Sequence, residues 1–221
     1  MINKIPNQYR PFFYIAIAII LKSLPIISLP LKWLESFFHE ISHGLAALVT
    51  GGRIIQIQLF PNGAGLCTTL GGSEFIILFS GYFGAVAWGL MIYYLANSFA
   101  KTAKTLIYFL IAIIGITIAL WTRDVLTLTL LIILIAMLSL ILKMSQGQFT
   151  KAAIQIVGLT IILNALYSPT FLIDGQSRGD GAALASITYI PEIIWVGIWL
   201  ITALLALTFV LFRRKAGNGQ Q

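Results

Sequence analysis

Long apolar segments, separated by short polar or charged stretches, follow one another along most of the 221-residue chain. A helix needs about 20 apolar residues to cross a bilayer, and most of the segments approach this length. They cover residues 12–29, 33–50, 75–96, 106–121, 125–142, 152–167 and 193–212. Lys22 and Pro25 interrupt the first segment, which we expect to be kinked or only partly inserted. The pattern therefore predicts an all-α polytopic membrane protein with six or seven transmembrane helices.

Residues 53–70 depart from this pattern, because apolar and polar positions alternate there. Apolar side chains at 55, 57 and 59 alternate with Gln56 and Gln58, and the sequence Pro61-Asn62-Gly63 follows. Alternation with Asn-Gly at the turn is typical of a β-hairpin. Strand edges cannot face lipid, so we expect the hairpin at the interface or against the protein.

Residues 168–191 are also too polar to cross a membrane, since they are rich in glycine and carry Asp174, Arg178 and Asp180. Whether six or seven segments cross, this acidic loop and the hairpin fall on the same face. The distribution of basic residues places the C-terminus in the cytoplasm. No internal repeat or domain boundary is visible, so we expect residues 1–221 to form a single transmembrane domain.

Composition supports a membrane protein and excludes other classes. Hydrophobic residues make up 59% of the chain and charged residues 10%, and the mean hydropathy is +0.95. A soluble domain typically carries about 25% charged residues. The net charge of +7 does not predict nucleic-acid binding, because the basic residues lie singly at segment ends apart from the cluster at 213–215. The single cysteine, Cys67, excludes an intramolecular disulfide, and we expect it to be a small buried side chain.

Both histidines of the chain lie in one run, His39-Glu40-Ile41-Ser42-His43. This is the pattern H-E-x-x-H, in which two imidazoles four residues apart share one helix face and can bind a single zinc ion. The glutamate lies beside that face, where it could polarise a water molecule. The alternative, two histidines satisfied by core hydrogen bonds, is the less favoured interpretation of such a motif.

A catalytic zinc takes three protein ligands and keeps one position open. No third histidine exists and Cys67 lies in the hairpin, so a carboxylate must supply the third ligand, and the chain has only seven acids. Glu35, although one turn before the histidines, is interpreted as a charge that reaches for the interface. Glu74 and Asp124 are expected to be solvated at span ends, and Glu192 suits a helix N-terminus.

Asp174 and Asp180 remain as candidates for the third ligand. Each is followed by a glycine, which lets the backbone approach a metal closely. We expect one of them to bind the metal and the other to support the site or cap a helix. Arg178 is expected to pair with the aspartate that does not bind the metal.

The motif at 39–43 with Gly44, the run Gly51-Gly52-Arg53, the hairpin and the small-residue stretch at 80–84 resemble the site-2 protease family of intramembrane zinc metallopeptidases. The likeness is to its compact bacterial branch, the peptidase M50B-like proteins. It extends nearly end to end, through the stretch at 180–185 and Pro191 to Trp195.

The resemblance implies roles for individual residues. His39 and His43 would be zinc ligands, Glu40 the general base, and a distant aspartate the third ligand. Asp174 resembles the family's Leu-Asp-Gly ligand segment with an isoleucine inserted, whereas Asp180 matches the segment typical of the compact branch. Both aspartates therefore stay open as the third metal ligand.

The resemblance also implies that the hairpin holds the substrate as an added strand. On this basis we predict that Gln56, Gln58, Asn62 and Gly63 bind substrate. The expected function is a membrane-embedded zinc endopeptidase that cleaves membrane-associated or transmembrane proteins within the lipid bilayer, in a bacterial cytoplasmic membrane. No nucleic-acid partner is expected, and the oligomeric state is left open.

Two other functions compete with this one. The chain could be a catalytically inactive membrane protein that keeps a metal site for a structural or regulatory role, which its small size favours. A transporter would need paired broken spans in two similar halves, and the sequence shows none.

Overall fold

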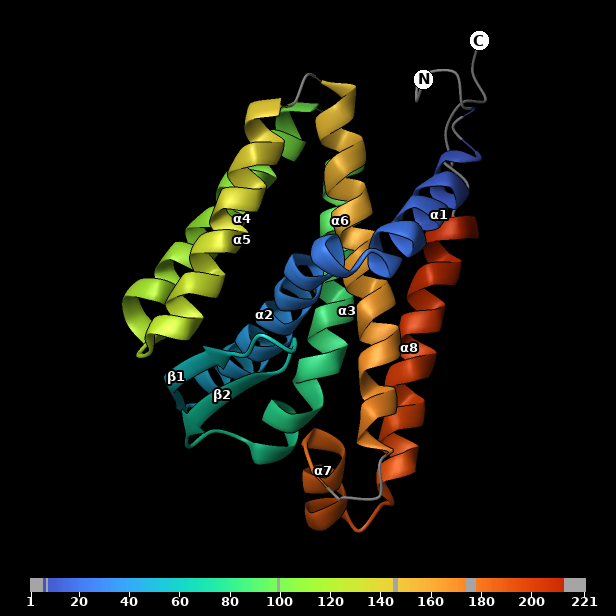
Figure 1. Ribbon diagram of the computed structural model, residues 1–221. Coiled ribbons are helices and arrows are strands. Elements are labelled where there is room, and N and C mark those ends of the chain that lie inside the picture. Colours follow the sequence, from blue (N-terminus) through green and yellow to red (C-terminus); the bar gives the residue numbers. More distant parts are fainter. Residues whose placement is uncertain (1–5, 7, 99, 145–146, 174–177, 213–221) are drawn as a thin grey trace.

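The computed structural model describes residues 6, 8–98, 100–144, 147–173 and 178–212, which form a helical bundle with one β-hairpin (Figure 1). The elements are α1 (Arg10–Ser23), α2 (Pro25–Val49), β1 (Arg53–Leu59), β2 (Gly65–Leu70), α3 (Glu74–Ser98), α4 (Ala100–Trp121), α5 (Val125–Met144), α6 (Gln148–Tyr167), the 3₁₀ helix η2 (Ser168–Leu172), α7 (Asp180–Thr188) and α8 (Glu192–Phe212). The predicted class, helical spans with a short hairpin after the histidine helix, is confirmed.

Five of these helices, α3, α4, α5, α6 and α8, are long and apolar enough to cross a membrane. The first two predicted segments form α1 and α2, which bend by 108° at their junction and together count as one further span at most. The described residues thus give five or six spans, and the seventh that the sequence allowed is not found. The bend follows from Pro25, which begins α2 and forces Leu24 into an extended conformation (φ −94°, ψ 108°).

The centre of the bundle is the contact between α3 and α6, where two glycines face each other. A Cβ atom on Gly158 would lie 2.7 Å from the backbone oxygen of Gly89 and 2.9 Å from the backbone nitrogen of Tyr93. Helices in lipid gain little from apolar burial, so close backbone approach through small residues is what holds them together. Ile154 and Ile161 of α6, fully buried beside Gly158, extend this core.

The hairpin forms where the sequence predicted it. β1 and β2 pair antiparallel with Leu59 opposite Gly65, and one register irregularity follows Ile54. The turn is closed by the backbone N–H of Phe60, which donates to the carbonyl of Ala64 at 2.9 Å. Gly63 has φ +89°, a conformation that favours glycine.

The two edges of the hairpin have different neighbours. The backbone N–H of Leu59 in β1 donates to the hydroxyl of Thr127 in α5 at 3.0 Å, which anchors that strand to the α4–α5 pair. β1 and β2 form a two-stranded sheet, so among the described residues the second edge of β2 has no strand partner. We call this second edge the free edge of β2. Figure 1 shows the hairpin and α7 at the same end of the bundle, as the sequence predicted for the hairpin and the acidic loop.

We expect Gly158→Ala to destabilise the bundle by about 1–3 kcal/mol, because its new Cβ would meet backbone atoms that cannot move aside. Thermal unfolding in dodecyl maltoside micelles, followed by tryptophan fluorescence, measures the change. Gly197→Ala on α8 is the matched control, since a Cβ there meets nothing within 4 Å. Equal unfolding midpoints for the two variants would contradict the close packing of α3 on α6.

Candidate metal centre

Helix α2 presents His39 and His43 side by side, one turn apart. Their Nε2 atoms lie 2.9 Å from each other. Nδ1 of His43 lies 2.6 Å from the backbone oxygen of Ile77 in α3. A carbonyl oxygen only accepts hydrogen bonds, so the proton of a neutral His43 must be on Nδ1. Its Nε2 lone pair is therefore free to bind a metal, with the ring held by a backbone group as is usual for metal-binding histidines.

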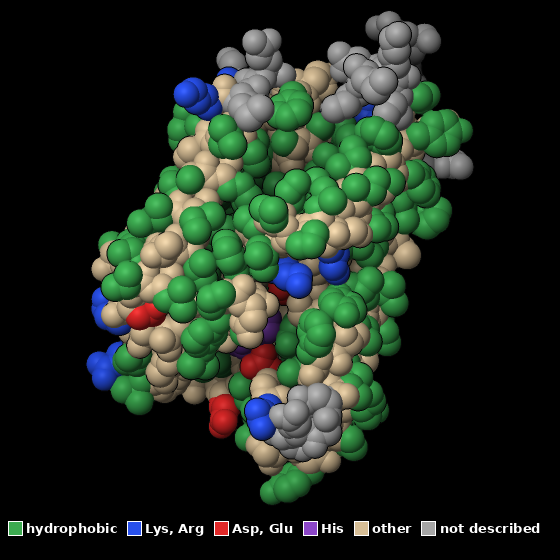
Figure 2. Space-filling view, viewed as in Figure 1, with side chains coloured by type: hydrophobic (Ala, Val, Ile, Leu, Met, Phe, Trp, Pro, Cys, Tyr) green, Lys and Arg blue, Asp and Glu red, His purple; other side chains and the backbone are tan. Residues whose placement is uncertain are grey.

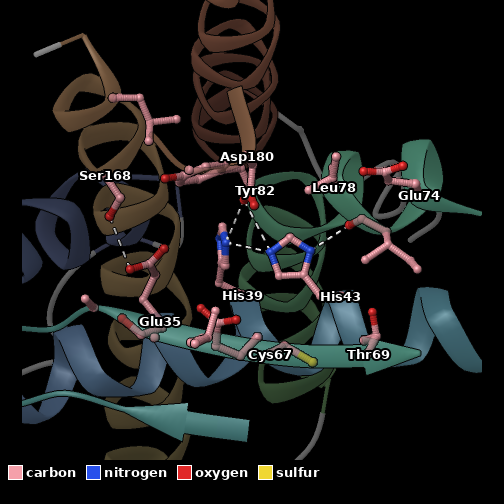
Figure 3. A pocket seen from close by; sticks show the side chains of 18 of the residues that line it. Glu35, His39, His43, Cys67, Thr69, Glu74, Leu78, Tyr82, Ser168 and Asp180 are labelled. Atoms are coloured by element: carbon pink, nitrogen blue, oxygen red, sulfur yellow. Dashed lines mark hydrogen bonds and ion pairs between the residues drawn. The ribbon is translucent and has the colours of Figure 1, made fainter. Parts of the chain in front are cut away.

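Asp180, the first residue of α7, completes the group (Figure 3). Its Oδ2 lies 3.1 Å from Nε2 of His39 and 3.3 Å from Nε2 of His43. Burial by itself raises the pKa of the Asp180 carboxyl, but the charges and hydrogen bonds of the two histidines outweigh burial and hold that pKa well below its usual range. The carboxylate is thus ionised at neutral pH. The other candidate, Asp174, lies outside the described residues.

The donor set fits a zinc ion. Two imidazole nitrogens and one carboxylate oxygen, all within 4.8 Å of one another, match the three protein ligands of a catalytic zinc site. The neighbouring space is kept open by Gly81 of α3, where a Cβ would lie 2.5 Å from Nε2 of His43 and 2.6 Å from Nε2 of His39. Any larger residue at this position would occupy the point on which the ligand atoms converge.

Glu40 lies buried between the histidine helix and β2. A Cβ on Gly65 would lie 2.5 Å from Oε1 of Glu40, so the glycine makes room for the carboxylate. The carboxylate also accepts a hydrogen bond from the backbone N–H of Cys67. Burial, together with the negative charge of Glu40, raises the pKa of the Cys67 thiol to about 12. The cysteine is consequently a protonated thiol at neutral pH and a poor metal ligand.

These residues line a cleft of about 790 Å³ between α2, α3, β2 and the chain that leads to α7. Figure 2 shows it as a hollow with histidine and acidic side chains at its base. The described residues that line the cleft include four acids but neither lysine nor arginine. They are Glu35, Glu40, Glu74 and Asp180.

The predicted substrate-binding residues are only partly at this cleft. Gly63 lines it, and Asn62 next to it accepts a hydrogen bond from the backbone N–H of Ala64 within the turn. Gln56 and Gln58 are on β1 beside Asp124 of the α4–α5 turn, and they are not among the residues that line the cleft. The strand next to the histidines is β2, which the sequence pattern did not single out.

Two other cleft residues were missed. Glu35 was interpreted as reaching the interface, and this was wrong: it is 4% exposed, lines the cleft and accepts a hydrogen bond from the hydroxyl of Ser168 at 3.2 Å. Its position four residues before His39 was the signal that could have placed it there. Tyr82 of α3 lies with its ring centroid 4.4 Å from that of His39. Nothing in the sequence distinguished it from the other aromatic residues of its span.

A model of the Peptidase M50B-like family matches residues 12–210. The chain belongs to this family. The match includes all four ligand candidates, Glu40 and the hairpin, and it confirms the resemblance to the site-2 proteases. Neither a curated protein nor a solved structure gives a significant match. Family membership and the apolar helices together describe a multi-pass membrane protein of a metallopeptidase family.

We expect Asp180→Asn to lower zinc affinity by more than 100-fold, because loss of a ligand should exceed the 10–100-fold typical of supporting residues. Asp174→Asn is the matched comparison and should bind zinc as the wild type does. Zinc content after dialysis against a competing chelator, determined by plasma mass spectrometry, measures both. If instead Asp174→Asn loses zinc and Asp180→Asn keeps it, Asp174 is the third ligand.

Proposed function

We propose that the chain is a membrane-embedded zinc endopeptidase that cleaves membrane-associated or transmembrane proteins. The observation that carries the proposal is the convergence of His39, His43 and Asp180 within 4.8 Å, with Glu40 buried in the same cleft. Membership of the Peptidase M50B-like family supports the reaction class. The likeness to the compact bacterial branch supports a bacterial cytoplasmic membrane as the location.

Zinc held by His39, His43 and Asp180 would supply a Lewis acid that activates water and polarises a peptide carbonyl. Glu40 is the proton acceptor in this proposal. It is buried next to the histidine pair, and it is the acid that the H-E-x-x-H spacing places beside the ligands. The hydrogen bond from the backbone of Cys67 fixes its carboxylate against β2.

Water and Glu40 together account for every bond and proton that changes in the proposed reaction. The water oxygen forms a bond to the carbonyl carbon while one water proton passes to Glu40. The carbon–nitrogen bond then breaks, and the proton held by Glu40 passes to the departing amine. Glu40 then takes the second water proton from the new carboxylic acid and passes it to the amine, so the products are a carboxylate and an ammonium group, and Glu40 returns to its ionised form.

The free edge of β2 is the proposed binding place for the substrate chain. It lines the cleft through Gly65, Cys67 and Thr69, and a peptide added there would run past the histidines as an extended strand. Gly63 at the turn lies at one end of this edge. A transmembrane helix would have to unwind locally before cleavage, because its own hydrogen bonds occupy the backbone groups that β2 would pair with.

We expect Glu40→Gln to lower the cleavage rate by at least 100-fold, because the proton acceptor is lost, and to leave zinc binding intact. His39→Ala should lose both cleavage activity and zinc binding. Cleavage of dye-labelled β-casein in dodecyl maltoside micelles and zinc content are measured on the same preparations. An unstructured chain is used because it can enter the cleft without unwinding.

The two outcomes separate the peptidase from a metal-binding protein without catalytic activity. A zinc-loaded wild type that cleaves neither casein nor any membrane protein captured by Glu40→Gln would overturn the proposed function. Cleavage by Glu40→Gln at the wild-type rate would overturn the role of Glu40.

A further inference from the structure

We propose that Tyr82 is a further catalytic residue, whose phenolic hydroxyl donates a hydrogen bond to the substrate carbonyl oxygen as that oxygen becomes negatively charged. The proposal rests on the peptidase function proposed above. It assigns a role to a residue outside the H-E-x-x-H motif and outside the acidic loop.

Tyr82 is placed at the metal centre by the close approach of α3. It follows Gly81, where an added Cβ would meet both imidazoles, and its side chain lines the cleft while only 9% of the residue is exposed. Its ring meets that of His39 edge-on, with the centroids 4.4 Å apart and the planes at 77°. Figure 3 shows the phenol extending across the cleft above His39, on the side where Ser168 lies.

The ring is held rigidly in this position. Trp199 of α8 also packs against the ring, with the ring centroids 4.7 Å apart. Trp199 is itself 1% exposed, and its indole N–H donates to the carbonyl of Phe79 at 3.3 Å. A donor fixed in advance loses little freedom when the reaction begins, which is the condition for effective stabilisation of a developing charge.

The Tyr82 hydroxyl is also free to act, since no hydrogen bond to it is found among the described residues. Two other hydroxyl groups of the cleft are engaged. The hydroxyl of Ser36 donates to the carbonyl of Gly63, and that of Ser168 is shared between Glu35 and the carbonyl of Asn164. The Tyr82 hydroxyl is therefore available to donate a hydrogen bond to a bound substrate.

The electrostatic surroundings favour such a donor. Negative charge develops on the carbonyl oxygen during attack by water, and most sites meet it with positively charged or N–H groups. Here the described residues that line the cleft include no lysine or arginine. The side-chain amide of Asn164 already donates a hydrogen bond to the carbonyl of Leu31. Against the ring of His39, Tyr82 supplies a neutral phenol, which keeps its proton at neutral pH and can donate to the substrate carbonyl oxygen.

The hydrogen bond adds no proton transfer to the reaction. As the water oxygen bonds to the carbon, the carbonyl π electrons move onto the oxygen, and the bond from Tyr82 shortens and strengthens. When the carbon–nitrogen bond breaks, these electrons return to re-form the carbonyl. The phenol keeps its proton throughout, and Glu40 alone carries the protons from water to the amine.

Tyr82→Phe tests the proposal, because it keeps the ring contacts with His39 and Trp199 and removes only the hydroxyl. We expect kcat for β-casein in dodecyl maltoside micelles to fall by about 100-fold or more, as when an oxyanion donor is lost, with KM and zinc content near the wild-type values. Tyr93→Phe is the matched control: it lies on the same helix, is 4% exposed and does not line the cleft. It should retain wild-type kcat.

A second measurement uses a phosphinic peptide, whose charged oxygens imitate the oxygen of the transition state. Tyr82→Phe should bind it at least 10-fold more weakly than wild type, and Tyr93→Phe should bind it equally. If Tyr82→Phe keeps both wild-type kcat and wild-type affinity while Glu40→Gln is inactive, the role of Tyr82 is wrong and the peptidase function stands. If the zinc-loaded wild type cleaves nothing, the proposed function fails, and the phosphinic peptide still decides whether the hydroxyl contacts a charged oxygen.

Discussion

The approach of α3 to the histidine face of α2 is the constraint on which the rest of the structure depends. At Gly81 the two helices are so close that a single added carbon would meet both imidazoles. One turn on, Gly84 faces the side chain of Ser42 in the same way. This closeness brings the carbonyl of Ile77 to His43 and the ring of Tyr82 to His39. Orientation of the ligands and position of the proposed donor thus both follow from one helix contact.

The hairpin shows how non-helical backbone is accommodated among the helices. Trp33 of α2 donates from its indole N–H to the carbonyl of Pro61 at 3.1 Å, and Ser36 donates to Gly63 in the same turn. On the other side Thr127 of α5 accepts the N–H of Leu59. These contacts are between the hairpin and protein rather than lipid, which is the condition under which strands are tolerated in a membrane protein. They also leave one edge of β2 open toward the metal centre.

Local features of the fold and site could be predicted from the sequence, because local spacing determines them. The H-E-x-x-H spacing placed two imidazoles on one helix face, and alternation with an Asn-Gly turn located the hairpin. The junction of α1 and α2 at Pro25 was visible as an interruption, although its 108° bend was not.

The rest depends on contacts between segments far apart in the chain. Asp180 is 141 residues from His39, and only the packing of α7 brings it there. Sequence spacing alone could not distinguish it from Asp174 as the third metal ligand. Which strand of the hairpin faces the histidines depends likewise on the α4–α5 pair, which anchors β1. Glu35 was misjudged because its burial requires the end of α6, where Ser168 meets its carboxylate.

The distribution of charge gives an independent reason to place a divalent cation in the cleft. Glu35 and Glu40 are buried, and Asp180 is largely so, whereas Glu74 is exposed and solvated. Burying a charge without a partner is costly, and Lys22, which lies near Glu35, offsets only one of the three carboxylates. A divalent cation in the cleft would offset negative charge on the carboxylates that Lys22 does not reach. A zinc ion held by the two histidines and Asp180 would supply this positive charge, and its binding would then stabilise the helices that form the site.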